Sequence, residues 1–217
     1  MFVIATHNGK KVLTNLLSDL SRFNISNENI CIVDNLSTSK DSLDYLERLK
    51  KENYKVLHNP ESTYEIGAYL YALKNFKSDV WFLMQDCNRF RYDFFSEITP
   101  KLTSNNVYCL LTFPTGMYDA PYDKMILSLH FGSWQYSKGT YGCTMFALDE
   151  VIQKVKNDWI IPRSKLDGAA AERTLSVIFD KHNIEIVGMG DYNSTRSSDP
   201  DPLTGYPHFY HIHSGRV

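Results

Sequence analysis

The stretch Asp79–Asn88, with the sequence DVWFLMQDCN, decides how the rest of the chain is interpreted. Its apolar run Val80–Met84 ends abruptly in polar residues. A short apolar run with β-branched and aromatic residues, bounded by polar ones, is typical of a buried strand. Open α/β sheets bind ligands outside the carboxyl ends of their strands, and Asp86 and Asn88 stand at such an end. Their oxygens could hold Mg²⁺, Mn²⁺, or a ribose and a diphosphate, although an Asx turn that closes a strand would explain the same residues.

Length and composition favour one globular domain. The chain has 217 residues, of which 43% are hydrophobic and 22% charged. A chain of this length and composition can bury a core without the help of disulfide bonds or a metal ion. The formal net charge of −2 argues against a dedicated nucleic-acid partner, which would call for a basic face. Scattered cysteines without a CxxC pair favour reduced thiols. With no signal peptide and no apolar span of about 20 residues, we expect a cytoplasmic protein without a transmembrane segment.

Strands and helices alternate in the first part of the chain. The predicted strands are Phe2–Ala5, Ile30–Val33, Tyr54–Leu57 and Val80–Met84. The segments between them repeat apolar residues at helical spacing. This order predicts an α/β fold in which a mostly parallel central sheet is flanked by helices. Because parallel strands align their carboxyl ends, the polar groups His7-Asn8, Asp34-Asn35 and Asp86–Asn88 should share one crevice.

The second part of the chain is less regular. Predicted strands are Val107–Phe113, Cys143–Leu148 and Ile184–Val187; predicted helices are Asp149–Val155 and 169–182; predicted loops are Pro114–Tyr122 and Trp134–Gly142. The tail from Asp191 to Val217 has several prolines and no clear period.

These features resemble the nucleotide-sugar-dependent glycosyltransferases of the GT-A fold, closest in style to family 2. The likeness lies in FVIATHN (2–8), ICIVDNLSTS (30–39) and the stretch from His58 to Asn88, which has DCN where the family has a metal-binding DxD. The resemblance implies a single GT-A-like domain over 1–217. Its nucleotide-sugar-binding half would be 1–105, and its acceptor-binding half, with the C-terminal tail, 106–217.

By this resemblance, the donor-binding residues are Thr6, Asn8, Asp34, Asn59, Gly67 and Asp86. Asp34 would accept a hydrogen bond from the imide N–H of a uracil-type base, which favours a UDP-sugar. As a strand-end residue it could instead cap the next turn, and ordinary turn propensity is likewise the alternative for Thr6 and Asn8.

The metal ligands implied at the diphosphate are Asp86 and Asn88, joined by late histidines. His211 and His213 face one side of the tail if it is extended, and either could complete a shell around Mn²⁺ or Mg²⁺; His208 is a weaker candidate. An HxH pair is also common in plain loops.

The resemblance also implies an acceptor loop, Trp134–Gly142, and a general base, Glu172 or Asp167, which would take the proton from the acceptor hydroxyl in an inverting reaction. Glu172 could instead be a solvated charge in a first helical turn, and Asp167 could be an N-cap.

The sequence therefore predicts a glycosyltransferase that moves a sugar from a nucleoside-diphosphate sugar to a saccharide or glycoconjugate acceptor. Two alternatives stay open. The DCN variant slightly favours a non-catalytic carbohydrate- or nucleotide-binding module on a degenerate GT-A scaffold. A nucleotidyltransferase would normally have a glycine-rich phosphate loop with a lysine, and THNGKK (6–11) has one glycine.

Overall fold

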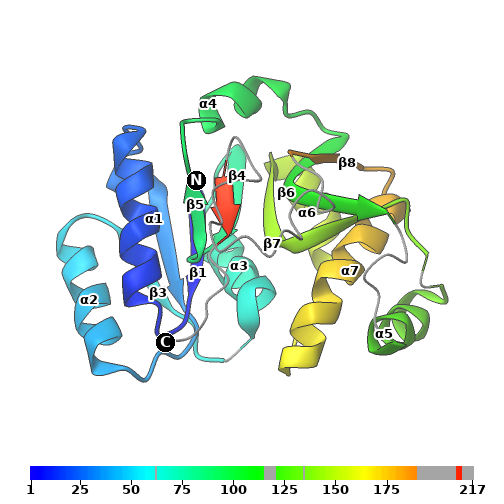
Figure 1. Ribbon diagram of the computed structural model, residues 1–217, viewed down its shortest axis with the longest axis horizontal. Coiled ribbons are helices and arrows are strands. Elements are labelled where there is room, and N and C mark those ends of the chain that lie inside the picture. The colour runs from blue at the N-terminus through cyan, green and yellow to red at the C-terminus, as the bar shows by residue number, and fades with distance from the viewer. Residues whose placement is uncertain (62, 115–120, 134, 190–208, 212–217) are drawn as a thin grey trace.

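The computed structural model describes residues 1–61, 63–114, 121–133, 135–189 and 209–211. Within these ranges a seven-stranded sheet carries helices on both faces, and a separate two-stranded pair lies beside it (Figure 1). The strands are β1 (Phe2–Thr6), β2 (Ile30–Asp34), β3 (Lys55–His58), β4 (Val80–Gln85), β5 (Asn88–Phe90), β6 (Asn106–Pro114), β7 (Lys138–Leu148), β8 (Glu185–Gly188) and β9 (Phe209–His211). The α-helices are α1 (Lys10–Arg22), α2 (Lys40–Lys51), α3 (Tyr64–Asn75), α4 (Phe95–Ile98), α5 (Pro121–Phe131), α6 (Asp149–Val155) and α7 (Lys165–Lys181).

The sheet is mixed but mostly parallel, as the sequence predicted. Its strand order is β3-β2-β1-β4-β7-β6-β8. The pairs β1–β2, β1–β4, β2–β3 and β6–β8 are parallel, whereas β7 runs antiparallel to both β4 and β6. The predicted α/β fold, with a mostly parallel central sheet flanked by helices, is therefore confirmed.

The strand order places a topological switch point between β1 and β4. From β1 the chain moves outward to β2 and β3, and then returns to form β4 on the other side of β1. Open α/β sheets form their ligand crevice at such a reversal, outside the carboxyl ends of the strands. The carboxyl ends of β1 and β4 are Thr6 and Gln85, and Asp86 follows directly.

Alternating residues of each central strand pack on opposite faces of the sheet. Phe2 and Ile4 pack in the same core cluster as the leucines of α1 and α2, whereas Val3 and Ala5 pack in the cluster that includes residues of α3 and α7. In α1 the apolar residues repeat at helical spacing, and the side chains of Leu13, Leu16, Leu17 and Leu20 are at most 5% exposed. Burying each leucine contributes roughly 1.5–3 kcal/mol, so this stripe holds α1 against the sheet.

Two predicted loops contain regular structure instead. In Trp134–Gly142, strand β7 already begins at Lys138. Gly139 lets the backbone of β7 approach the Phe113 ring, because a Cβ on this residue would lie 2.2 Å from Cε2 of Phe113. In Pro114–Tyr122, helix α5 begins at Pro121, and proline suits a first helical turn.

One further boundary differs from the prediction, and two strands are new. Helix α7 begins at Lys165 rather than at residue 169, because the Ser164 side chain accepts a hydrogen bond from the backbone N–H of Asp167 as an N-cap. Strands β5 and β9, which pair with each other, were not predicted at all. Among the described helices, none is long and apolar enough to cross a membrane.

Candidate active site

Thr6, Asp34 and Asp86 meet at the carboxyl ends of three neighbouring parallel strands. Thr6 is directly opposite Asp34 in the β1–β2 register. On the other side of β1, the Thr6 hydroxyl donates a 2.6 Å hydrogen bond to Oδ2 of Asp86, whose backbone N–H bonds to the carbonyl of Ala5. All three side chains therefore lie on the α1–α2 side of the sheet, at the switch point.

Gly9, at the start of α1, makes room for the Asp86 carboxylate. A Cβ on Gly9 would lie 2.0 Å from Oδ2 of Asp86 and 2.7 Å from the hydroxyl oxygen of Thr6. No side chain fits there without displacing one of the two groups. The first turn of α1 is thereby brought directly against the carboxylate.

The Asp86 carboxylate is poorly solvated. The pKa of Asp86 is raised to about 7, mainly by burial. The hydrogen bond from Thr6 lowers this pKa, and the nearby Glu65 carboxylate raises it. No lysine or arginine of the described residues forms an ion pair with Asp86. A buried carboxylate without a cationic partner is destabilised as an anion and gains from a bound cation.

Asn8 fastens the loop after β1 to the start of α2. Its Oδ1 accepts hydrogen bonds from the backbone N–H groups of Thr38 (2.9 Å) and Ser39 (2.8 Å). Its own backbone N–H donates to the Ser37 hydroxyl at 2.7 Å, and its φ is 53°. The Asn8 side chain is thus engaged in fixing two loops at the crevice edge.

Asp34 is 3% exposed and holds the turn that follows β2. Its Oδ1 accepts a hydrogen bond from the backbone N–H of Ser37 at 3.0 Å, and its Oδ2 lies 3.2 Å from Nδ1 of His58. The turn-capping role that the sequence left open is therefore present, and it leaves the carboxylate at the strand edge beside Thr6.

Asn59 and Gly67 belong to a buried polar network behind the crevice. The Asn59 amide donates to Oδ1 of Asn35 (2.8 Å) and to the Thr63 hydroxyl (2.7 Å). A Cβ on Gly67 would lie 1.8 Å from that Thr63 oxygen, so only glycine leaves Thr63 in place. Asn59 and Gly67 therefore influence the carboxyl ends of β2 and β3 indirectly, through Asn35 and Thr63.

Asn88 faces inward rather than towards the crevice. It is 1% exposed, and its Oδ1 accepts hydrogen bonds from the backbone N–H of Gln85 (3.0 Å) and from the Thr144 hydroxyl of β7 (2.8 Å). The oxygen that would ligate a metal is occupied in closing the β4–β5 turn. The bond from Gln85 runs backwards along the chain, so Asn88 closes the turn after β4 without forming the Asx turn that was the alternative.

The backbone of His211 lies next to the DCN segment. Strand β9 pairs antiparallel with β5 so that His211 is opposite Asn88, and β5 and β9 lie side by side (Figure 1). Residues 209–211 thus lie within one strand spacing of the segment that follows Asp86. His208 and His213 lie outside the described residues.

The two candidate bases are in different environments, both on α7. Asp167 accepts hydrogen bonds from the Tyr122 hydroxyl (2.5 Å) and from the backbone N–H of Arg163 (3.1 Å). The hydrogen bond from Tyr122 is the main reason why the pKa of Asp167 lies below its ordinary value. Glu172 forms a 2.9 Å ion pair with Arg173, whose guanidinium stacks 4.6 Å from the Phe113 ring centre. Asp167 lies in the first turn of α7 and is not its N-cap, which is Ser164, and the hydrogen bonds to its carboxylate make it a weak base.

Sequence reasoning missed Glu65, Gln85 and Thr144. Glu65 accepts a 2.9 Å hydrogen bond from the Gln85 amide, and Thr144 anchors Asn88. Gln85 stands in the DVWFLMQDCN stretch, next to Asp86, which is a local signal that could have found it. Nothing in the helical pattern of 64–75 distinguishes Glu65 from a surface charge.

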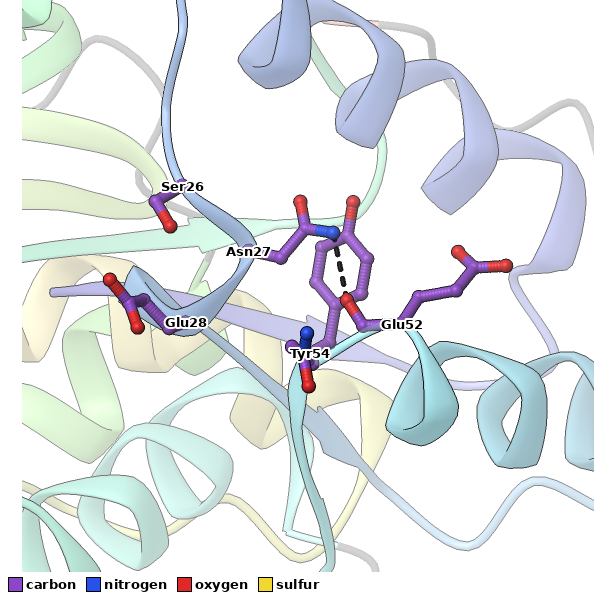
Figure 2. A pocket seen from close by; sticks show the side chains of 6 residues that line it. Ser26, Asn27, Glu28, Glu52 and Tyr54 are labelled. Carbon is purple, nitrogen blue, oxygen red and sulfur yellow. Dashed lines mark hydrogen bonds between the residues drawn. The ribbon is translucent and has the colours of Figure 1, made fainter.

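A shallow polar hollow lies at the opposite end of the strands. Figure 2 shows it between the segment before β2 and the one before β3, where Asn27 donates a 2.9 Å hydrogen bond to the Glu52 carbonyl. Its lining residues are Ser26, Asn27, Glu28, Glu52, Asn53 and Tyr54. Because ligands of such sheets bind at the carboxyl ends, this hollow is not the candidate site.

A divalent cation suits Asp86 but only part of the predicted ligand set. The carboxylate without a cationic partner, with Glu65 adding negative charge, favours a cation. Asn88 does not fit, because its oxygen already accepts two hydrogen bonds. Among the described residues no group of three His, Cys, Asp or Glu side chains is placed to hold a metal ion.

The switch point, the Asp86 carboxylate beside it and the mixed sheet are consistent with a GT-A-type scaffold. The sequence pattern described as Glycosyl transferase family 2 matches residues 1–142, which include β1 to β4 and Asp86. The chain belongs to glycosyl transferase family 2. No curated protein sequence matches it.

Solved structures share the fold at low sequence identity. Residues 1–349 of S. aureus TarS in complex with UDP are 15% identical, with a TM-score of 0.55 over 86% of this chain and 56% of that chain. Mannosyltransferase PcManGT from Pyrobaculum calidifontis in complex with GDP-Man and Mn²⁺ is 10% identical, with a TM-score of 0.59 over 91% and 57%. A nucleotidyl transferase from Methanothermobacter is 10% identical, with a TM-score of 0.54 over 87% and 85%. At these identities the likeness shows the fold alone, and the chain spans about half the length of the TarS structure.

Proposed function

We propose that this chain is a glycosyltransferase that moves a sugar from a nucleoside-diphosphate sugar to a saccharide or glycoconjugate acceptor. The meeting of Thr6, Asp34 and Asp86 on one side of the β1–β4 switch point carries the proposal. Membership in glycosyl transferase family 2 supports it. Residues 1–105 would bind the donor, and 106–217 the acceptor.

Asp34 would bind the base and Asp86 the ribose and diphosphate. Since Asp34 accepts hydrogen bonds and stands beside Thr6, the imide N–H of uracil suits it, and a UDP-sugar is the favoured donor. Asn8, Asn59 and Gly67 would hold the loops that enclose the nucleotide. The first turn of α1 would face the phosphates with its positive dipole end.

A divalent ion, Mn²⁺ or Mg²⁺, would supply charge neutralisation for the leaving diphosphate. Asp86 would be its carboxylate ligand, with His211 or His213 completing the set. Thr6 would keep the Asp86 carboxylate oriented, and Asn88 would keep the turn after Asp86 closed through Thr144.

Glu172 would act as the general base on the acceptor hydroxyl, which implies inversion at the anomeric carbon. The 2.9 Å ion pair with Arg173 would hold the Glu172 carboxylate in place. Asp167 is the weaker candidate, because its two oxygens already accept hydrogen bonds that stabilise its anion.

A donor screen tests this function. UDP-, GDP-, CDP- and dTDP-sugars would be compared by thermal shift with and without Mn²⁺, and then by release of nucleoside diphosphate. We expect one nucleotide class to raise the melting temperature and to be turned over. A chain that binds none of them would contradict the proposal.

A second candidate is a non-catalytic nucleotide- or carbohydrate-binding module. Two observations favour it: Asn88 is turned inward to Thr144, and Glu172 is paired with Arg173. Binding of UDP and a UDP-sugar without any donor hydrolysis or transfer, in the presence of Mn²⁺, would establish this function and exclude the transferase.

A further inference from the structure

Glu65 lies beside the diphosphate end of the candidate site but on the other face of the sheet from Asp86. It stands in the first turn of α3, and its Oε1 accepts a 2.9 Å hydrogen bond from the amide of Gln85. Gln85 immediately precedes Asp86, and successive residues of a strand point to opposite faces. The hydrogen bond between Gln85 and Glu65 therefore places the Glu65 carboxylate on the α3–α7 side of the end of β4.

The Glu65 carboxylate adds negative charge near both β4 and β7. Burial is the main cause of the raised pKa values of Asp86 and Cys143, and Glu65 raises both further. Among the described residues no lysine or arginine forms an ion pair with Glu65. In a transferase the sugar being moved occupies the space between the diphosphate and the base.

A second, independent observation is the Tyr69 hydroxyl. Tyr69 is one helical turn beyond Glu65 on α3, so both side chains share a face. It is 0% exposed, and its hydroxyl has no hydrogen-bond partner within the described part of the chain. A buried hydroxyl without a partner costs about 1–3 kcal/mol, and such groups in native proteins usually serve a ligand or an ordered water.

We propose that Glu65 and Tyr69, with Gln85 holding the Glu65 carboxylate, form a subsite for hydroxyl groups of the donor's sugar. This inference rests on the proposed function and adds a specificity determinant to it. A carboxylate accepts hydrogen bonds from sugar hydroxyls and repels phosphate, which argues against the diphosphate as the occupant. The Tyr69 hydroxyl would be reached directly or through one water, and would then have its missing partner.

The consequence is discrimination between sugars. A site built to hydrogen-bond a substrate hydroxyl rejects analogues that lack it, because its polar groups then stay unpaired. Glu65 should therefore contribute to binding of the sugar and contribute nothing to binding of the nucleotide.

The test compares a nucleoside diphosphate with its own hexose derivative. UDP and UDP-GlcNAc, UDP-glucose and UDP-galactose would be titrated calorimetrically into the full chain and into Glu65→Ala, Glu65→Gln and Tyr69→Phe, and the corresponding GDP ligands would be used if the wild type prefers GDP. Glu52→Ala, at the far end of the sheet, is the matched carboxylate control.

For Glu65→Ala we expect an affinity for the free diphosphate within about twofold of the wild type, and a loss of about tenfold or more for the preferred sugar nucleotide. Tyr69→Phe should weaken sugar binding while leaving the melting temperature of the unliganded protein unchanged or higher, which a purely structural tyrosine would not do. Glu65→Gln should change the order of preference among the three hexoses.

Equal loss for diphosphate and sugar nucleotide, or no loss for either, would overturn the subsite while leaving the transferase proposal intact. A wild-type chain that binds no nucleoside diphosphate would remove the transferase proposal, and the subsite with it.

Discussion

The Thr6 hydroxyl donates a 2.6 Å hydrogen bond to Oδ2 of Asp86 and so joins the carboxyl ends of β1 and β4. These strands are adjacent in the sheet although 80 residues separate Thr6 from Asp86. The bond lies at the switch point, where the first turn of α1 also arrives. The position of the Asp86 carboxylate in the candidate active site depends on this hydrogen bond.

Gly9→Ala should displace the Asp86 carboxylate, because the new Cβ would lie 2.0 Å from its Oδ2. We expect donor hydrolysis to fall by about tenfold or more while far-UV circular dichroism stays unchanged. The stability loss should be smaller in an Asp86→Ala background, where the clashing oxygen is absent, and a double-mutant cycle measures this coupling. Strictly additive losses would show that the two residues do not meet.

The stability of the metal-free protein should fall as the pH rises from about 4 to 7. The folded-state pKa of Asp86 is raised to about 7 from its ordinary 3.8, so in this window the folded chain keeps a proton that the unfolded chain releases. The loss reaches at most roughly 4 kcal/mol and is complete above pH 7. In Asp86→Asn, urea unfolding across this range should show a flatter pH dependence than the wild type; parallel curves would contradict the assigned pKa.

Asn88→Asp recreates a DxD sequence but should not raise activity. Asn88 is 1% exposed, and its oxygen serves Gln85 and Thr144, so the substitution buries a charge. We expect a loss of about 3 kcal/mol or more in unfolding free energy at pH 8, with part of it recovered at pH 5. Asn105→Asp on the exposed surface is the control. Increased transfer with Mn²⁺ in Asn88→Asp would mean that residue 88 faces the metal after all.

The buried carboxylate of Asp19 should be needed to hold strand β5. It is 2% exposed and accepts hydrogen bonds from Nε (2.6 Å) and Nη2 (2.9 Å) of Arg89 and from the backbone N–H of Phe90 (3.0 Å). Asp19→Ala should cost about 3 kcal/mol in chemical denaturation, because the partly buried Arg89 guanidinium and the Phe90 N–H lose this carboxylate. Adding Arg89→Ala to that variant should cost little more, and two full, additive losses would show that the pair is not coupled.

Much of the first part of the fold could be predicted because its signals are local. The apolar run Val80–Met84 is a buried strand, and the apolar spacing of 10–23 is helix α1. The shared edge for Asp34 and Asp86 followed from parallel pairing alone. The hydrogen bonds that Asn8 accepts from Thr38 and Ser39 could not be predicted, since they depend on how two loops meet.

The remaining features could not be predicted because they arise from distant pairing. Strand β9 is three residues long, and its partner β5 lies more than 100 positions earlier, so no local pattern reveals either. Gly139 stands in the predicted loop Trp134–Gly142, yet it serves packing against Phe113 within β7. Glu65 acquires its place at the site only when α3 docks against β4.

The most direct test of the central claim asks which end of the sheet binds the nucleotide. UDP and GDP, each with Mn²⁺, would be titrated calorimetrically into the wild type, into Asp86→Asn at the carboxyl ends, and into Glu52→Gln in the hollow of Figure 2. We predict that Asp86→Asn loses affinity by about 100-fold, since the ion and diphosphate lose a carboxylate worth several kcal/mol, and that Glu52→Gln binds as the wild type does. Unchanged binding by Asp86→Asn, or a loss confined to Glu52→Gln, would contradict the account.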